Sequence, residues 1–302
     1  MLSFKKIEQS DIDTYKKYYD YSECMGCDTN LLNVFLWRDE YNIKFAFYDD
    51  TLVKVYCNPD DSIWGYCMPT GKNVKGAVEQ IIKDAAERSG DCQIVMLTNG
   101  NRAMLETMFP NRFSFERSPE NQDYIYLTRD LATLAGKKFH AKRNHISKFY
   151  RTYTDTRFET LSDSNIDDVI AVAKMWYEEN GIDTNSDQSG ELAAIKDMCS
   201  LRKDYDDIRG GVLYVDSKPV AMTVGSEISP KIYDINFEKA LREYDGVYAV
   251  INNEFAKTLT QYEYINREED MGLEGLKKSK LSYNPVIILD RWNAVPIKNE
   301  EN

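Results

Sequence analysis

The stretch Asn266–Pro285, NREEDMGLEGLKKSKLSYNP, combines acids, glycines and lysines at the boundary between a predicted strand and a predicted helix. The strand ends at Ile265, and Leu273 and Lys280 lie at helical spacing, so residues 268–272 form the turn between the two elements. In open α/β sheets, ligands bind at this kind of turn. The alternative, which spacing alone favours, is a structural helix whose acidic start and basic end suit its dipole.

Composition limits the class of protein and its partners. The chain has 302 residues, 42% of them hydrophobic and 12% aromatic, which is enough to fill two cores. The formal charge of −12 repels polyanions, so nucleic acid or an anionic membrane would have to meet a local basic patch. No apolar run reaches the roughly 18 residues of a membrane span, and no signal-peptide core follows Met1. We therefore expect a cytoplasmic protein.

The six cysteines favour reduced core thiols over a disulfide framework. Four of them have apolar sequence neighbours: Cys57, Cys67, Cys92 and Cys199. Cys24 and Cys27 form a lone C-x-x-C with no second pair and no nearby histidine. We interpret it as a turn with two incidental thiols and expect no metal, with zinc or redox use as the alternative.

The two halves of the chain repeat one predicted order: helices, an antiparallel meander, helix, strand, helix and strand. In the first half, helices are expected at 10–19, 30–41, 74–90 and 101–109, and strands at 43–48, 51–56, 62–68, 93–97 and 123–127. In the second half, helices are expected at 164–180, 188–201, 247–259 and 272–280, and strands at 209–215, 219–227, 231–237, near 264 and at 286–290. This order predicts an α+β (α/β) fold of two tandem domains, 1–135 and 158–302, each a mixed, largely antiparallel sheet flanked by helices. Residues 136–157 would be a linker helix.

The linker region is a basic island in an acidic protein, and it contains the only two histidines of the chain. Phe139, Ile146 and Phe149 would share one face of a helix. The basic residues with candidate ligand contacts are Lys142, Arg143, His145 and Lys148. They form either a solvated face that pairs with nearby acids, or a phosphate-contacting element for a polyanionic ligand such as tRNA.

Three segments carry a family resemblance: Leu36-Trp37-Arg38 with Tyr41, residues 137–149 and residues 266–285. Over nearly its whole length the chain resembles bacterial proteins grouped with the catalytic C-terminal domain of phosphatidylglycerol lysyltransferase. Its order of elements is similar to two domains of the GCN5-related N-acetyltransferase (GNAT) fold in tandem, as in the Fem-type peptidoglycan aminoacyltransferases. The membrane-spanning portion of the lipid-modifying enzymes has no counterpart here, which makes a lipid substrate less expected.

The resemblance implies roles for residues of the quoted stretch. Lys280, at the end of a segment that contains Gly275, would stabilise the reacting acyl carbonyl or the terminal phosphate of a donor RNA. Asp270 and Glu268 are candidate bases on the turn before Gly272. Asn236, with Asp234 on the preceding strand, would orient the acceptor.

The segment that would bind the pyrophosphate of coenzyme A departs from the GNAT pattern. Acetyl-coenzyme A enzymes use a Q/R-x-x-G-x-G/A loop, whose backbone N–H groups face the phosphates. Here Glu243 takes the basic or amide position and Tyr248 the small one, while Asp245 adds a negative charge beside Gly246. In the first half, the turn at Gly71 offers only a weak phosphate-loop signal. The sequence thus argues against coenzyme A in the second half.

Three functions follow from these patterns. The first is transfer of an acyl or aminoacyl group, with aminoacyl-tRNA or an acyl-coenzyme A as donor, to an amine or hydroxyl of a small molecule or peptide. The second is acetyl-coenzyme A-dependent N-acetyl transfer. The third is a non-catalytic module that binds a metabolite or protein, which the two poor phosphate loops support.

Overall fold

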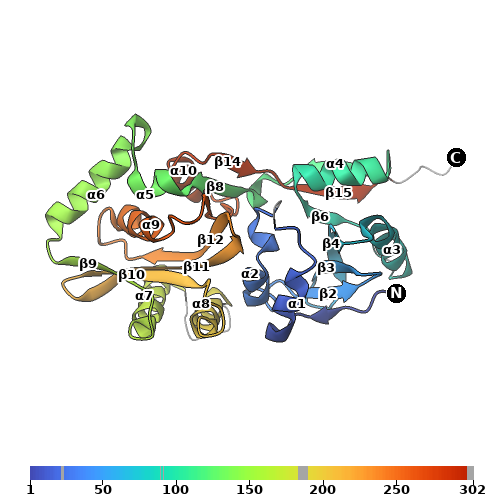
Figure 1. The fold of residues 1–302 in the computed structure, drawn as a ribbon, viewed down its shortest axis with the longest axis horizontal. Helices are drawn as coiled ribbons and strands as arrows, with labels where there is room; N and C mark the ends of the chain where they lie inside the picture. The colour runs from blue at the N-terminus through green and yellow to red at the C-terminus, as the bar shows by residue number, and fades with distance from the viewer. Residues whose placement is uncertain (22–23, 89, 91, 183–189, 298–302) are drawn as a thin grey trace.

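The computed structural model describes residues 1–21, 24–88, 90, 92–182 and 190–297, and shows an α+β fold with two mixed sheets flanked by helices. The sheets lie at the two ends of an elongated molecule (Figure 1). The start of the helix predicted at 188–201 lies outside the described residues, and the helix is seen from Gly190.

The first sheet has the order β1-β2-β3-β4-β6-β15-β7, and β5 pairs with β3. Its strands are β1 (Lys5–Lys6), β2 (Ile43–Phe47), β3 (Thr51–Cys57), β4 (Ile63–Cys67), β5 (Thr70–Gly71), β6 (Ile94–Leu97), β7 (Phe113–Arg117) and β15 (Trp292–Pro296). The accompanying helices are η1 (Gln9–Asp11), α1 (Ile12–Lys16), η2 (Cys27–Thr29), α2 (Leu31–Leu36), α3 (Val74–Glu87), α4 (Asn99–Met108) and η3 (Pro119–Asn121).

The second sheet has the order β14-β8-β13-β12-β11-β10-β9. Its strands are β8 (Asp123–Leu127), β9 (Thr156–Thr160), β10 (Arg209–Val215), β11 (Lys218–Ser229), β12 (Ile232–Ala240), β13 (Tyr264–Asn266) and β14 (Ile287–Leu289). The helices are α5 (Thr128–Thr133), η4 (Lys137–Phe139), α6 (His140–Thr152), α7 (Ile166–Glu179), α8 (Gly190–Leu201), α9 (Val247–Thr258) and α10 (Glu274–Leu281).

The predicted repeat of architecture is confirmed by the strand pairing. In each sheet an antiparallel meander leads into a parallel pair that is connected through a helix: β4–α3–β6 in the first sheet and β12–α9–β13 in the second. Parallel neighbours require such a crossover connection, which explains why helical periodicity follows the meander in both halves.

Each sheet also receives a strand from the other half of the chain. β8 pairs with β13 and β14 of the second sheet, and β15 pairs with β6 and β7 of the first. Strand pairing therefore does not follow the expected boundaries 1–135, 136–157 and 158–302. β15 was not predicted, because its five residues follow β14 after a two-residue gap and carry no alternating apolar pattern.

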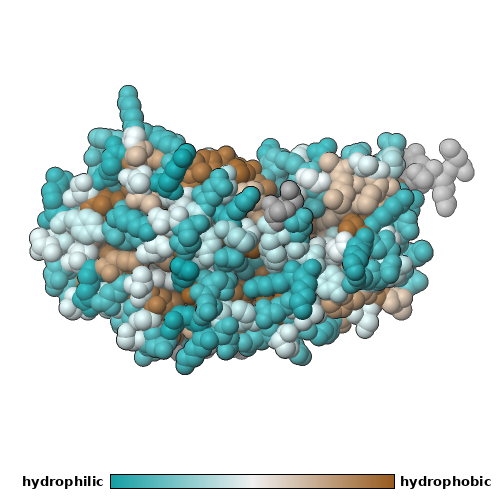
Figure 2. All heavy atoms as spheres, viewed as in Figure 1, coloured by the Kyte–Doolittle hydropathy of each residue, from teal (hydrophilic) through white to brown (hydrophobic). Residues whose placement is uncertain are grey.

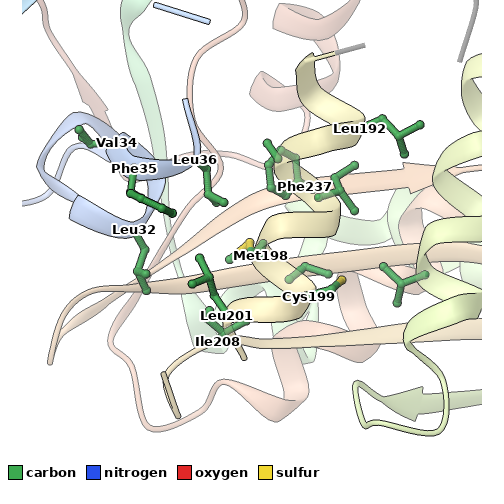
Figure 3. Close-up of a cluster of buried hydrophobic side chains, with 14 of the residues drawn as sticks. Leu32, Val34, Phe35, Leu36, Leu192, Met198, Cys199, Leu201, Ile208 and Phe237 are labelled. Carbon is green, nitrogen blue, oxygen red and sulfur yellow. The ribbon is translucent and has the colours of Figure 1, made fainter. Parts of the chain in front are cut away.

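A shared hydrophobic core joins the two halves (Figure 3). Leu32 and Phe35 of α2 face Met198 and Leu201 of α8, with Phe237 of β12 beside them. All five side chains are at most 9% exposed. Because apolar burial is the main favourable contribution to folding, this cluster fixes α2 against the second sheet.

Helix α2 ends at Leu36, although the sequence predicted a helix to residue 41, and Asn30 caps its start by accepting from the N–H groups of Leu32 and Asn33.

The face in Figure 2 is mostly hydrophilic, with an apolar patch over α10 and β14. Its exposed apolar residues are Met271, Leu273, Leu281, Val286 and Ile288.

Candidate active site at the divergence of two parallel strands

Strands β12 and β13 separate in the middle of the second sheet. They pair in parallel only as far as Asp234 opposite Asn266. β13 then ends, whereas β12 continues to Ala240. Among the described strands, none pairs with residues 235–240 on that side of β12. The backbone edge left open there can bind a ligand, as sheet edges do.

An ion pair spans the opening between the strands. Arg267 Nη2 lies 2.8 Å from Glu238 Oε1, and Asn252 Nδ2 donates to the other oxygen of Glu238 at 3.3 Å. The Arg267 guanidinium also lies 4.8 Å from the centre of the Tyr283 ring. Within the described part of the chain, the buried Nη1 of Arg267 has no hydrogen-bond partner. A buried, unsatisfied guanidinium N–H is costly and is suited to receive a ligand oxygen.

Lys142 approaches the same ring from α6. Its Nζ lies 3.7 Å from the Tyr283 ring centre. Burial, and then the charge of Arg267, lowers the pKa of Lys142 to about 8. The sequence predicts either a solvated basic residue or a phosphate ligand at Lys142, and the environment that the structure gives it is typical of an amine that exchanges protons near neutral pH.

Lys280 does not face the opening but holds the turn that leads away from it. Its Nζ donates to the carbonyl oxygens of Arg267 and Glu269, and to that of Glu268 at 3.0 Å. The three bonds use all three donors of the ammonium group. Burial, followed by the charge of Arg267, lowers the pKa of Lys280. These contacts favour a positioning role over the predicted contact with an acyl carbonyl.

The turn itself is fixed by its own side chains. Asn266 Oδ1 accepts from Glu268 N at 2.7 Å, and Asp270 Oδ1 accepts from Gly272 N at 2.9 Å. Tyr124 donates its hydroxyl to the other oxygen of Asp270 at 2.5 Å. Glu268 and Gly272 have positive φ angles of 54° and 71°. Asp270 therefore terminates the turn, and Gly272 supplies a conformation that other residues rarely adopt.

A second polar region lies beside the turn, where η2 and α2 meet the second sheet. Asn236 Nδ2 donates to Asp234 Oδ2 at 3.1 Å and to Glu268 Oε1 at 3.4 Å, and Asn33 Nδ2 donates to the same Glu268 oxygen at 3.1 Å. Asn30 Nδ2 also donates to Asp234 Oδ2, at 3.2 Å. The structure thus brings together Asn236, Asp234 and Glu268, three residues that the sequence analysis names as site candidates.

The acids of this region raise one another's pKa values. Burial, followed by the neighbouring Asp123, raises the pKa of Asp234 well above its usual value and also raises that of Glu269. Burial, followed by Asp234, raises the pKa of Glu268. Burial and then Asp123 raise the pKa of the Cys27 thiol. The cluster combines buried carboxylates with a thiol, and the buried Arg291 pairs with Asp123 at 2.9 Å.

The remaining predicted ligand residues are apart from the opening. Arg143 donates to the carbonyl oxygens of Leu134 and, at 2.7 Å, Gly136, so it caps the end of α5. Lys148 pairs with Asp245 at 2.6 Å. The His145 side chain is exposed on α6. Gly275 lies on α10, where an added Cβ would meet nothing within 4 Å.

The start of α9, where the fold would place a pyrophosphate, is partly covered by α6. Gly246 is the N-cap of α9, with a φ of 88°, and a Cβ there would lie 3.0 Å from the carbonyl oxygen of His145. Tyr248 in the first turn accepts a hydrogen bond from Trp176 at 2.9 Å. In the first half, β5 pairs the turn at Gly71 with β3. Both loops are thus occupied by contacts within the chain.

Sequence reasoning did not identify Arg267 and Glu238 as site residues. Arg267 lies in the quoted stretch, and its position at the strand end was the available signal. Glu238 lies two residues after Asn236 on β12, but the pairing of β12 with β11 shifts between Asp234 and Phe237. Glu238 therefore contacts Asn252 of α9, whereas Asn236 contacts Glu268 on the opposite face, and strand alternation alone would have misplaced Glu238. The proximity of Cys27 and Asp123 had no sequence signal, since 96 positions separate them.

Comparison with known proteins agrees with this fold. Residues 21–295 match the family model described as phosphatidylglycerol lysyltransferase, C-terminal. A conserved protein of unknown function from Bacteroides thetaiotaomicron is 37% identical, with a TM-score of 0.89 over 98% of this chain and 100% of that one. L-PGS from Bacillus licheniformis is 11% identical, with a TM-score of 0.67 over 99% of this chain and 94% of its own.

The FemX structure is also similar, at 8% identity and a TM-score of 0.58 over 97% of both chains. These likenesses show the tandem GNAT fold. Within the described residues, no helix is both long and apolar enough to cross a bilayer.

Proposed function

The chain belongs to the phosphatidylglycerol lysyltransferase C-terminal family, and from this we propose that it transfers an acyl or aminoacyl group to an amine or hydroxyl acceptor. The proposed site is the opening between β12 and β13. One observation carries the proposal: the Arg267 guanidinium lies in this opening with its buried Nη1 unpaired within the described structure.

Arg267 is suited to stabilise the oxyanion of acyl transfer. Its Nη2 is held by Glu238, so Nη1 has a fixed direction before the substrate arrives. A preorganised donor at the developing negative charge is a large contribution to catalysis. Lys280 supports this arrangement, because it binds the carbonyl oxygen of Arg267 itself.

Lys142 is suited to act as the base. With a pKa of about 8, about a tenth of its amine is neutral at pH 7 and about half at pH 8. The neutral amine takes a proton from the acceptor N–H or O–H while the acceptor lone pair forms a bond to the acyl carbon. Arg267 stabilises the negative charge that develops on the carbonyl oxygen by donating a hydrogen bond to it. The bond from the acyl carbon to the donor oxygen or sulfur then breaks, and the leaving atom takes the proton from Lys142.

Aminoacyl-tRNA is the donor that the contacts favour. The contacts of Gly246 and Tyr248 leave the start of α9 poorly suited to a pyrophosphate. Next to Lys142, helix α6 presents the exposed basic side chains of His140, His145 and Arg151. The Lys148–Asp245 pair is exposed, and exposed pairs contribute little, so phosphate can displace Asp245.

The test is discharge of a radiolabelled aminoacyl-tRNA pool in the presence of mixed primary amines. Removing an oxyanion donor slows reactions of this class by about 10²–10³, so Arg267→Gln should lose that much of the discharge rate. Arg129→Gln is the matched control, since the Arg129 side chain is 80% exposed. Circular dichroism of both variants monitors folding.

The outcomes separate the three functions. Equal rates for Arg267→Gln and Arg129→Gln would remove the oxyanion role. No discharge, combined with a rise in melting temperature on adding acetyl-coenzyme A, would favour an N-acetyltransferase. No response to either donor would favour a non-catalytic binding module.

A further inference from the structure

Three potential metal ligands converge beside the turn, from segments far apart in the sequence. The ligand atoms of Cys27, Asp123 and Glu269 lie within 4.8 Å of one another. Cys27 Sγ lies 3.3 Å from Asp123 Oδ1 and 3.8 Å from Glu269 Oε2. Tetrahedral zinc, with Zn–S of about 2.3 Å and Zn–O of about 2.0 Å, separates its sulfur and oxygen ligands by about 3.5 Å. The two observed distances lie on either side of this value.

Asp123 is held so that one oxygen is directed at the thiol. Its Oδ2 accepts three hydrogen bonds: from Arg291 Nη2 at 2.9 Å, Cys27 N at 3.1 Å and Asn266 Nδ2 at 3.2 Å. Its Oδ1 accepts from Cys27 Sγ. Hydrogen bonds to the non-coordinating atom orient ligand groups in metal centres. The aspartate is thus already positioned for coordination.

Asp234 provides an independent sign of a missing ligand. Its side chain is fully buried, and within the described structure its Oδ1 has no hydrogen-bond partner. In the strand register, Asp234 is opposite Asn266, which is opposite Ile125 on β8. Cross-strand partners share a face, and so do alternate residues of a strand, so Asp234 lies on the face that carries Asp123. Asp234 is not among the residues whose ligand atoms lie within 4.8 Å of one another, so its free oxygen would reach the same cation through a bridging water.

The excess of negative charge in this region also favours the binding of a cation. Four acids meet here: Asp123, Asp234, Glu268 and Glu269. The nearby Arg291 is shared between Asp28 and Asp123, and the Lys280 ammonium is turned to backbone carbonyls. Buried carboxylates are normally paired or bound to metal. These contacts leave the cluster short of positive charge.

We propose that Cys27, Asp123 and Glu269 bind a zinc-type divalent cation, with a water molecule that hydrogen-bonds to Asp234 at the fourth position. On binding, the metal–sulfur bond replaces the Cys27 S–H bond, and the thiol proton leaves to solvent. The thiolate ligand favours zinc or cobalt over magnesium or calcium, which prefer oxygen alone. The bound cation links η2, which accompanies the first sheet, to β8 and the turn of the second sheet, independently of the transfer reaction.

The direct test is titration of the purified, metal-stripped protein with Co²⁺, which reports thiolate coordination by its charge-transfer absorption. We expect one equivalent to bind with this band present, and Zn²⁺ to displace it. Cys27→Ala should lose the band. Cys199→Ala is the matched control, because Cys199 is another buried thiol, within the core on α8, and it should keep the band.

Two further variants keep the test informative if Cys27→Ala fails to fold. Glu269→Gln alters a half-buried side chain and should weaken Co²⁺ binding. Asn266→Ala removes a partner of Asp123 Oδ2 and should weaken it by about 10–100-fold. No charge-transfer band in the unaltered protein, or a band that survives in a folded Cys27→Ala, would overturn the proposal. If alkylammonium ions raised the melting temperature of the protein and cobalt were not coordinated, the proposal would also be overturned. The acids would then be assigned to the binding of an amine ligand.

Discussion

Glu238 and Arg267 form an ion pair of 2.8 Å across the point where β12 and β13 part, and both side chains are nearly buried, at 9% and 12% exposure. Tyr126 and Tyr283 lie beside the guanidinium. The pair connects β12, which carries Glu238, to the turn that follows β13 and begins with Arg267. Orientation of Arg267 and stability of the opening therefore depend on the same contact.

Glu238→Gln should destabilise the protein, because it leaves the Arg267 charge buried without its partner. Removing one member of a buried pair costs about 3–5 kcal/mol in free energy of unfolding, which urea denaturation measures. Glu243→Gln, at an exposed position, is the control and should change little. An unchanged midpoint in Glu238→Gln would show that Arg267 is solvated or paired elsewhere.

The rate of the proposed transfer should rise with pH and level off above about 8, because Lys142 acts as a base only when it is neutral. The measurement is the pH profile of single-turnover discharge under saturating donor. Lys142→Met should lower the plateau and abolish the inflection, while Lys278→Met, an exposed lysine on α10, should retain both. A profile that inflects identically in Lys142→Met would assign the proton transfer to another group.

Stability should also respond to Lys142. Its folded-state pKa of about 8 is below the usual lysine pKa of 10.5, so between these pH values the unfolded chain binds more protons than the folded one. The free energy of unfolding therefore gains a contribution as pH rises from 8 to 10.5. Chemical denaturation across this range should show a smaller gain in Lys142→Met than in the unaltered protein; an identical gain would contradict the lowered pKa.

Lys280→Met should disrupt the turn, and it should do so without removing a contact to the substrate, because Lys280 does not face the opening. It leaves the carbonyl oxygens of residues 267–269 without their shared donor, and each buried unsatisfied group costs about 1–3 kcal/mol. We expect a clear loss of unfolding free energy, and Lys277→Met, exposed on the same helix, serves as control. If Lys280→Met were fully stable yet inactive, Lys280 would be a catalytic residue, as the family resemblance implied.

The shared core predicts that the two halves unfold together. Leu201→Ala removes a buried side chain between α2 and α8 and should cost about 2–5 kcal/mol. Leu281→Ala, at 42% exposure, should cost much less. Fluorescence and circular dichroism should give coincident transitions in both variants, whereas two separated transitions would show that the halves are independent.

Local patterns were sufficient for most elements. Helical spacing predicted α3, α7 and α9 to within a few residues; the largest difference is the end of α3, at Glu87 and not at residue 90. Alternation predicted the strands of both meanders. The sequence also placed Asn236 and Glu268 in one site. It assigned Lys280 to the substrate because a lysine at the end of a helix looks the same whether its ammonium faces a ligand or backbone carbonyls.

The sequence by itself determined the repeated order of elements, the excess of negative charge and the strand-to-helix turn at residues 268–272, because these depend on neighbours within a few residues. Tertiary structure decided which strands complete each sheet, which cation faces the opening, and that Cys27 meets Asp123 and Glu269. Those contacts join residues tens to hundreds of positions apart. They are set by chain crossovers and by the burial of charge, which no local periodicity encodes.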